Sequence, residues 1–173
     1  ALFGAISFGF STYLLIILQV GHNTKALAVS FFPFVIAGML LLFQKRWLWG
    51  ILLSCLAIGM QIRANHYQMS YYLLMLMGVF VLIYGYHDVR NKNRRSFLKS
   101  FVGLTVAGII ALGFNATPLL ATAEYAQFST RGASELKLSA NGSPKEQSSG
   151  LDYEYITEYS YGIFESLNLI APR

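Results

Sequence analysis

The sequence predicts an all-α protein: a polytopic transmembrane helix bundle of about five spans, followed by a polar, partly helical extracytoplasmic segment. Apolar residues make up 55% of the chain and charged residues only 12%, whereas a soluble domain carries roughly a quarter charged residues. The apolar residues also fall into blocks that approach or reach the ~20 residues an α-helix needs to cross a bilayer. These two observations exclude a soluble domain of ordinary composition.

The apolar blocks give the expected spans directly, at residues 2–20, 26–43, 47–62, 69–86 and 97–120. Pro33 is expected to kink the second span, because neighbouring groups must satisfy the carbonyl that a proline leaves free. The third block is slightly short, and Pro118 lies near the end of the fifth. We therefore expect a bundle over residues 1–121 and an extracytoplasmic loop and interfacial segment over residues 122–173.

One span carries a packing signal. Gly103, Ala107 and Ala111 recur at every fourth position, which places three small residues on one helix face. Small residues let a second transmembrane helix approach closely. We expect this face to lie inside the bundle.

The orientation follows from lysine and arginine in the short loops, because cytoplasmic loops are enriched in both. One basic loop holds Lys45 and Arg46, and another runs from Arg90 to Arg95. Residues 44–46 and 87–96 are therefore expected on the cytoplasmic side. Residues 21–25, 63–68 and 122–173 are expected outside. The excess of lysine and arginine over acidic residues lies at the expected membrane boundaries and so does not indicate a nucleic-acid partner.

The chain begins at Ala1 inside an apolar block, with no basic leader of the kind that opens a signal peptide. It ends at Arg173 with no obvious stop feature. We expect it to be an internal fragment of a longer membrane protein.

Chemically mixed clusters gather on the expected outer side, and every acidic residue except Asp88 lies there. If the helices form one bundle, the turns at residues 22–25 and 63–68 and the segment from Glu124 to Gly132 meet at one end. Three cations there are candidates for binding a phosphate or pyrophosphate, with arginine acting as a planar fork and lysine as a point charge. These are Lys25, Arg63 and Arg131.

The remaining candidates suit proton handling and hydroxyl-rich ligands. Imidazoles and a carboxylate can move a proton, and His22, His66 and Glu124 are the candidate catalytic residues. Amides and an aromatic ring suit a sugar or an acceptor, and the candidates for such contacts are Asn23, Asn65, Gln68 and Tyr161. The histidine spacing does not match a zinc motif, so we assign no metal ligand, and a requirement for a divalent metal stays open.

Each of these residues also has a purely structural interpretation. Arg63 and Lys25 at span ends can extend their charged groups to the lipid headgroups. His22 and His66 can bond to loop backbone, and Glu124 can pair with Arg131. The tyrosine-rich tail around Tyr161 is also typical of an interfacial belt.

The outer clusters resemble the bacterial YfhO-like membrane proteins over essentially the whole chain. The resemblance rests on Gly21-His22-Asn23-Thr24-Lys25, Gln61-Ile62-Arg63-Ala64-Asn65-His66-Tyr67-Gln68, Asn115-Ala116-Thr117-Pro118, Phe128-Ser129-Thr130-Arg131-Gly132, and Tyr159-Ser160-Tyr161-Gly162 with Glu165, Asn168 and Pro172.

The resemblance implies a function that the residues alone do not show. YfhO-like proteins look like GT-C-type glycosyltransferases, which take a sugar from a polyprenyl-phosphate carrier and add it to an acceptor outside the cytoplasmic membrane. The acceptor implied here is a cell-envelope polymer or glycolipid. Enzymes of this type usually place a catalytic carboxylate in their first outer loop, which is expected upstream of Ala1.

Two other functions stay open from the sequence. A transporter or flippase for a lipid-linked sugar could use the same outer cations to bind headgroups. However, transporters tend to place ionisable groups near the membrane midplane, and the expected span interiors hold none apart from Lys99 near an inner end. A non-catalytic scaffold in the cell envelope is the third possibility, and in that case the outer polar residues are individually dispensable.

Overall fold

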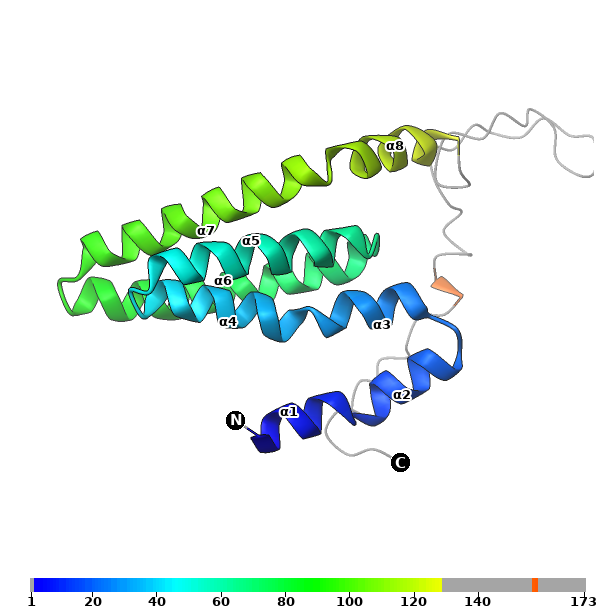
Figure 1. Ribbon diagram of the computed structural model, residues 1–173, viewed down its shortest axis with the longest axis horizontal. Coiled ribbons are helices and arrows are strands. Elements are labelled where there is room, and N and C mark those ends of the chain that lie inside the picture. Colours follow the sequence, from blue (N-terminus) through cyan, green and yellow to red (C-terminus); the bar gives the residue numbers. More distant parts are fainter. Residues whose placement is uncertain (1, 129–156, 159–173) are drawn as a thin grey trace, which may run out of the picture. The chain divides into compact units, whose positions relative to one another are not determined.

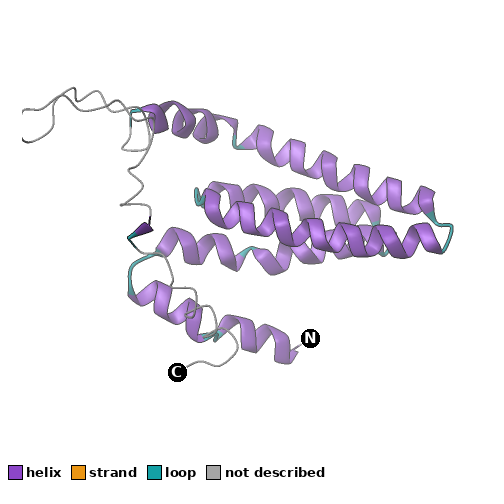
Figure 2. Cartoon of the chain, turned by 180° about the vertical axis from the view of Figure 1, so that it is seen from behind, coloured by secondary structure: helices purple, strands orange, loops and turns teal. Residues whose placement is uncertain are grey.

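The computed structural model describes residues 2–128 and 157–158, and the described part of the chain is all helical, as predicted (Figures 1 and 2). The chain divides into two units, residues 1–118 and 119–173. The helices are, in order, α1 (Leu2–Gly9), α2 (Thr12–Gln19), α3 (Asn23–Ser30), α4 (Phe32–Phe43), α5 (Trp47–Arg63), α6 (Tyr67–Arg90), α7 (Arg94–Phe114) and α8 (Ala116–Gln127).

Four helical segments among the described residues are long and apolar enough to cross a membrane. They are Leu2–Gln19, Asn23–Phe43, Tyr67–Arg90 and Arg94–Phe114. The remaining expected span, α5, has 17 residues, which at 1.5 Å per residue is about 25 Å and slightly less than the ~30 Å of hydrocarbon. The sequence therefore predicts the membrane-spanning character of four blocks and the shortness of the third.

The first two apolar blocks are each interrupted. The first block is divided between α1 and α2 at Phe10 and Ser11, and the second is divided between α3 and α4 at Phe31. Pro33 lies in the first turn of α4, where the backbone N–H that a proline lacks would have no partner within the helix. The interruption expected at Pro33 thus lies two residues earlier.

The fifth block ends sooner than predicted. Helix α7 ends at Phe114 rather than continuing to residue 120. The buried side chain of Asn115 donates through Nδ2 to the carbonyl oxygen of Ala111 at 2.8 Å and to that of Gly59 at 3.1 Å. Asn115 therefore caps the carbonyl of Ala111 in the last turn of α7 and also ties this end of α7 to α5, and Pro118 falls in the first turn of α8.

The core of the first unit lies where α4, α5 and α7 pack together. Met39 and Leu42 of α4 are fully buried, and Leu104 of α7 joins them. Glycines allow the close approach: a Cβ at Gly38 would lie 2.7 Å from the backbone nitrogen of Ser54, and one at Gly50 would lie 2.8 Å from that of Leu42. Small residues at helix contacts are typical of membrane bundles.

The predicted small-residue face of α7 is part of this core. Ala107 and Ala111 are fully buried, and Gly103 is buried against Leu42 and Ile51. The prediction that these residues face the bundle interior is confirmed.

Outward faces of the helices are apolar as well. Phe3, Leu82 and Phe114 are each more than 70% exposed, and many other large apolar side chains accompany them. A soluble monomer rarely exposes so much contiguous apolar surface. Such faces suit lipid or further transmembrane helices.

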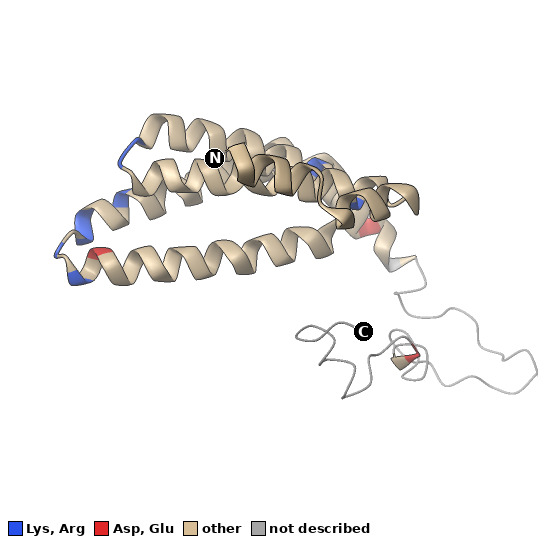
Figure 3. Cartoon of the chain, turned by 90° about the horizontal axis from the view of Figure 1, so that it is seen from below, with Lys and Arg blue, Asp and Glu red and all other residues tan. Residues whose placement is uncertain are grey.

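Charged residues gather at the ends of the helices, as Figure 3 shows. Successive helices from α4 to α7 reverse direction, so the basic turns at residues 44–46 and 90–95 share one end (Figure 1). The turn at residues 64–66 lies at the other end. Residues 47–62 and 67–86 contain no Asp, Glu, Lys or Arg. The predicted orientation requires basic turns at one end of the bundle and the other turns at the opposite end, and the structure agrees with this. Which end faces the cytoplasm stays a prediction.

Candidate functional site

The tight turn between α5 and α6 holds several of the predicted site residues. Helix α5 ends at Arg63, and Asn65 takes a left-handed conformation with φ of 54°. Asparagine is among the few non-glycine residues that visit this region readily. His66, with φ of −124° and ψ of 82°, then directly precedes the first residue of α6. The sequence Arg63-Ala64-Asn65-His66 therefore reverses the chain within three residues.

This turn packs against α3 through small side chains. Ala28 of α3, Ala64 of the turn and Met69 of α6 form one buried cluster, with Val29 and Phe32 against it. Lys25 lies three residues before Ala28, and hence on the same side of α3. The two expected outer clusters, residues 22–25 and 63–68, are therefore associated with one end of the first unit.

The candidate side chains at the beginning of α3 differ in exposure and in their contacts. His22 and Asn23 are exposed at the start of the helix. Lys25 is half-buried and holds its Nζ 5.4 Å from the ring centroid of Tyr13 in α2, a cation–π contact. Lys25 thus lies near the beginning of the candidate span Asn23–Phe43 and is directed toward α2.

The candidates around the α5–α6 turn differ in their burial. Arg63, Asn65 and Gln68 are exposed, and Nε2 of Gln68 donates to the hydroxyl of Tyr72 at 2.9 Å. His66 is half-buried, and its Nδ1 is buried with no hydrogen-bond partner in the described part of the chain. A buried imidazole nitrogen without a partner is a candidate for contact with a ligand.

Within residues 2–128 and 157–158, no hydrogen bond or salt bridge joins two of the predicted site residues. Glu124 is exposed on α8 in the second unit. Arg131 and Tyr161 lie outside the described residues. In the same described ranges no three His, Cys, Asp or Glu side chains gather as a metal site would require.

A polar pair that sequence reasoning did not single out lies beside this turn. Gln61 is 2% exposed, and its Oε1 accepts a hydrogen bond from the Ser70 hydroxyl at 3.1 Å. Its Nε2 is buried and has no partner among the described residues. An unpaired buried amide costs about 1–3 kcal/mol, so its retention suggests a ligand with acceptor oxygens.

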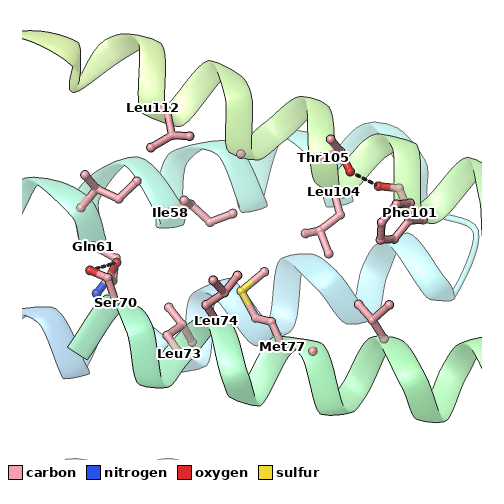
Figure 4. A pocket seen from close by; sticks show the side chains of 14 residues that line it. Ile58, Gln61, Ser70, Leu73, Leu74, Met77, Phe101, Leu104, Thr105 and Leu112 are labelled. Carbon is pink, nitrogen blue, oxygen red and sulfur yellow. Dashed lines mark hydrogen bonds between the residues drawn. The ribbon is translucent and has the colours of Figure 1, made fainter. Parts of the chain in front are cut away.

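Gln61 and Ser70 lie at one end of an apolar groove with a volume of about 590 Å³ (Figure 4). Helices α5, α6 and α7 line it, with Ile58, Leu73, Met77 and Leu104 among the residues that face it. Thr105 also lines it, but its hydroxyl already donates to the carbonyl oxygen of Phe101 at 3.0 Å. The groove is therefore apolar along its length and polar at the end nearest the α5–α6 turn.

Two glycines keep this groove open. Gly78 of α6 and Gly108 of α7 both line it, and a Cβ added at either would meet nothing within 4 Å. No neighbouring helix therefore requires a glycine at position 78 or 108, whereas the close helix contacts at Gly38 and Gly50 do require one.

Arg63 borders a different, smaller pocket of about 340 Å³ on the opposite side of α5. Cys55, Gly59 and Asn115 also line this pocket. Gln61 and Arg63 are only two residues apart on α5, so the two cavities open near the same end of the helix.

No protein-family model, curated protein or solved structure matches this chain.

Proposed function

We propose that this chain is part of a polytopic, GT-C-like membrane glycosyltransferase of the YfhO-like kind. It would transfer a sugar from a polyprenyl-phosphate carrier to a cell-envelope acceptor on the outer face of the bacterial cytoplasmic membrane. The observation that carries the proposal is the apolar groove that ends at the unpaired Gln61 amide.

The groove suits the hydrocarbon part of such a carrier. An isoprenoid chain has no hydrogen-bonding groups, and the lining of α5, α6 and α7 offers it aliphatic side chains such as Leu73, Leu74 and Val81. About 590 Å³ falls within the range of ligand pockets and holds several isoprene units rather than a whole long carrier. The remainder of the chain would lie in the bilayer.

The polar end of the groove suits the phosphate and the sugar. The free Nε2 of Gln61 would donate to a phosphate or hydroxyl oxygen, and the Ser70 hydroxyl holds the amide in place. His66, with an unpaired Nδ1, lies four residues before Ser70 at the start of α6. A lipid-borne sugar would thus have its linkage to phosphate at the membrane boundary.

The cations would stabilise the departing phosphate. In the transfer, an acceptor hydroxyl oxygen bonds to the anomeric carbon while the bond from that carbon to the phosphate oxygen breaks. The polyprenyl phosphate leaves with the bonding electron pair and gains negative charge, which Arg63, Lys25 and Arg131 would offset. Preorganised cations of this kind contribute most where water is excluded.

The proton of the acceptor hydroxyl requires a base. We assign this role to Glu124, His66 or His22, or to a carboxylate upstream of Ala1, as the family resemblance implies. Asn23, Asn65, Gln68 and Tyr161 would contact the sugar or the acceptor.

The test uses the full-length parent protein in nanodiscs with radiolabelled polyprenyl-phosphate sugars and a membrane extract. Gly108→Leu fills the groove at a position where a Cβ meets nothing, and Gly113→Leu is the matched control, because Gly113 is equally open but does not line the groove. We expect transfer in the wild type and in Gly113→Leu, and a loss of at least tenfold in Gly108→Leu.

Other results would point to the rival functions. Carrier binding or movement across the bilayer without sugar transfer would replace the glycosyltransferase with a flippase. Full activity in the Gly108→Leu variant would show that the groove does not hold the carrier. An absence of both binding and transfer in the wild type would favour a scaffold.

A further inference from the structure

A second groove, of about 450 Å³, lies between α5 and α7 near the basic end of the bundle. Trp47 and Ile51 line it from the first turns of α5, and Lys99, Val102 and Val106 line it from α7. Trp47 directly follows the basic turn at residues 44–46. This groove therefore lies at the opposite end of α5 from Gln61 and is independent of the function proposed above.

Lys99 is the charged residue at this groove. Its Nζ lies 4.8 Å from the ring centroid of Trp47, and its side chain is exposed. A cation–π contact positions an ammonium without using its hydrogen-bond donors. Lys99 can therefore hold an anion at the mouth of the groove while its charge stays over the indole.

The indole of Trp47 supplies the second observation. Its Nε1 is buried, and no acceptor for it exists in the described part of the chain. Buried tryptophan N–H groups usually have a partner. An oxygen of a ligand that enters beside the ring, after a small shift of the covering side chains, would provide the missing acceptor.

The charges around the groove favour an anionic ligand. Arg95 precedes Lys99 by four residues and so shares its face of α7, and Arg46 immediately precedes Trp47. Asp88 of α6, the acidic residue within residues 2–118, does not line the groove. The mouth of the groove is thus cationic.

The apolar lining distinguishes a lipid from a free anion. Ile51, Val102 and Val106 are aliphatic and extend the groove away from Lys99 along the helices. A soluble phosphate would bind the cations but would leave this lining uncovered. An acyl chain covers it, and the phosphate of the same molecule reaches the headgroup layer.

We propose that this groove binds one anionic phospholipid. Lys99 and Arg95 hold the phosphate, the Trp47 N–H donates to a phosphate or ester oxygen, and an acyl chain lies along Ile51, Val102 and Val106. The binding site belongs to the protein itself and is more specific than the general attraction of basic loops to an anionic membrane surface.

The test is native mass spectrometry of the full-length protein, released from nanodiscs that contain equal amounts of phosphatidylglycerol and phosphatidylcholine. Lys99→Gln removes the charge at the groove. Lys92→Gln is the matched control, since Lys92 is an exposed cation in the turn before α7 and does not line the groove. Val102→Trp fills the groove while leaving every cation in place.

We expect one retained phosphatidylglycerol on the wild type and on Lys92→Gln. Both Lys99→Gln and Val102→Trp should reduce this occupancy at least fivefold, and Lys99→Arg should restore it. Equal losses in Lys92→Gln and Lys99→Gln, or equal retention of phosphatidylcholine, would overturn the proposal. Thermal unfolding in detergent identifies any variant that has lost its fold. If Lys99→Gln or Val102→Trp is unfolded, the phosphatidylglycerol occupancy of Lys99→Arg is compared with that of the wild type instead.

Discussion

The Ser70 hydroxyl donates to Oε1 of Gln61 at 3.1 Å and thereby links the end of α5 to the beginning of α6. This bond satisfies one end of a buried amide and leaves Nε2 free at the polar end of the groove. In a protein interior an unsatisfied donor is costlier than an absent one. Substitutions of Gln61 and Ser70 therefore test directly whether the free Nε2 of Gln61 binds a ligand.

Two substitutions in this pair should have unequal effects on the free energy of unfolding. Gln61→Leu removes the unpaired group and should change the free energy of unfolding by less than about 1 kcal/mol, whereas Ser70→Ala leaves both ends of the amide unpaired and should cost about 1–3 kcal/mol. Denaturation in mild detergent measures both. If Gln61→Leu were the more damaging, the amide would be a structural element rather than a ligand contact.

Arg63→Ala should lower sugar transfer by at least a hundredfold, because the charge that offsets the departing phosphate is lost. Arg63→Lys should recover part of the activity, since it restores the charge but not the planar fork. Lys45→Ala, at an exposed cation of the opposite end, is the control and should leave transfer unchanged. Unaltered transfer in Arg63→Ala would contradict the phosphate assignment.

Asn115→Ala should destabilise the first unit. The substitution removes the bonds from Nδ2 to the carbonyl oxygens of Gly59 and Ala111, at about 1–3 kcal/mol in total. Asn93→Ala is the comparison, because Asn93 precedes α7 without a side-chain capping bond and is exposed. Thermal unfolding of the two variants should differ clearly, and equal midpoints would mean that Asn115 does not stabilise the end of α7.

Gly38→Ala should separate α4 from α5. The new Cβ would lie 2.5 Å from the Ser54 hydroxyl oxygen and 2.7 Å from the Ser54 backbone nitrogen, and such overpacking costs about 1–3 kcal/mol. Gly113→Ala, where a Cβ meets nothing, should be neutral or slightly stabilising because alanine favours a helix. A neutral Gly38→Ala would show that the two helices pack less closely than described.

The parts of the fold that depend on local composition could be predicted. Apolar blocks of sufficient length predicted the four helical segments that are long enough to cross a membrane, and the spacing of Gly103, Ala107 and Ala111 predicted the inward face of α7. The positions at which the helices are interrupted or end were harder to predict, because they depend on individual side-chain contacts. Asn115, at the end of α7, also bonds to Gly59, which is 56 residues earlier in the chain, and no local pattern encodes such a partner.

The candidate site was predictable only in part, for a related reason. Residues at turns, such as Arg63 and His66, are visible in a sequence as polar groups between apolar blocks. Gln61 falls inside the predicted third span, and its burial depends on how α6 packs beside α5. Glu124 lies in the second unit, while Arg131 and Tyr161 lie outside the described residues, so their participation stays a prediction.

The most direct measurement of the central claim is photo-crosslinking of the full-length protein by a polyprenyl phosphate that carries a diazirine in its isoprenoid chain. We predict labelling of groove residues on α5, α6 and α7, including Leu73, Met77 and Val81 of α6. Gly108→Leu should abolish the labelling and Gly113→Leu should preserve it. Labelling confined to other helices, or unchanged in Gly108→Leu, would contradict the assignment of this groove to a lipid-linked substrate.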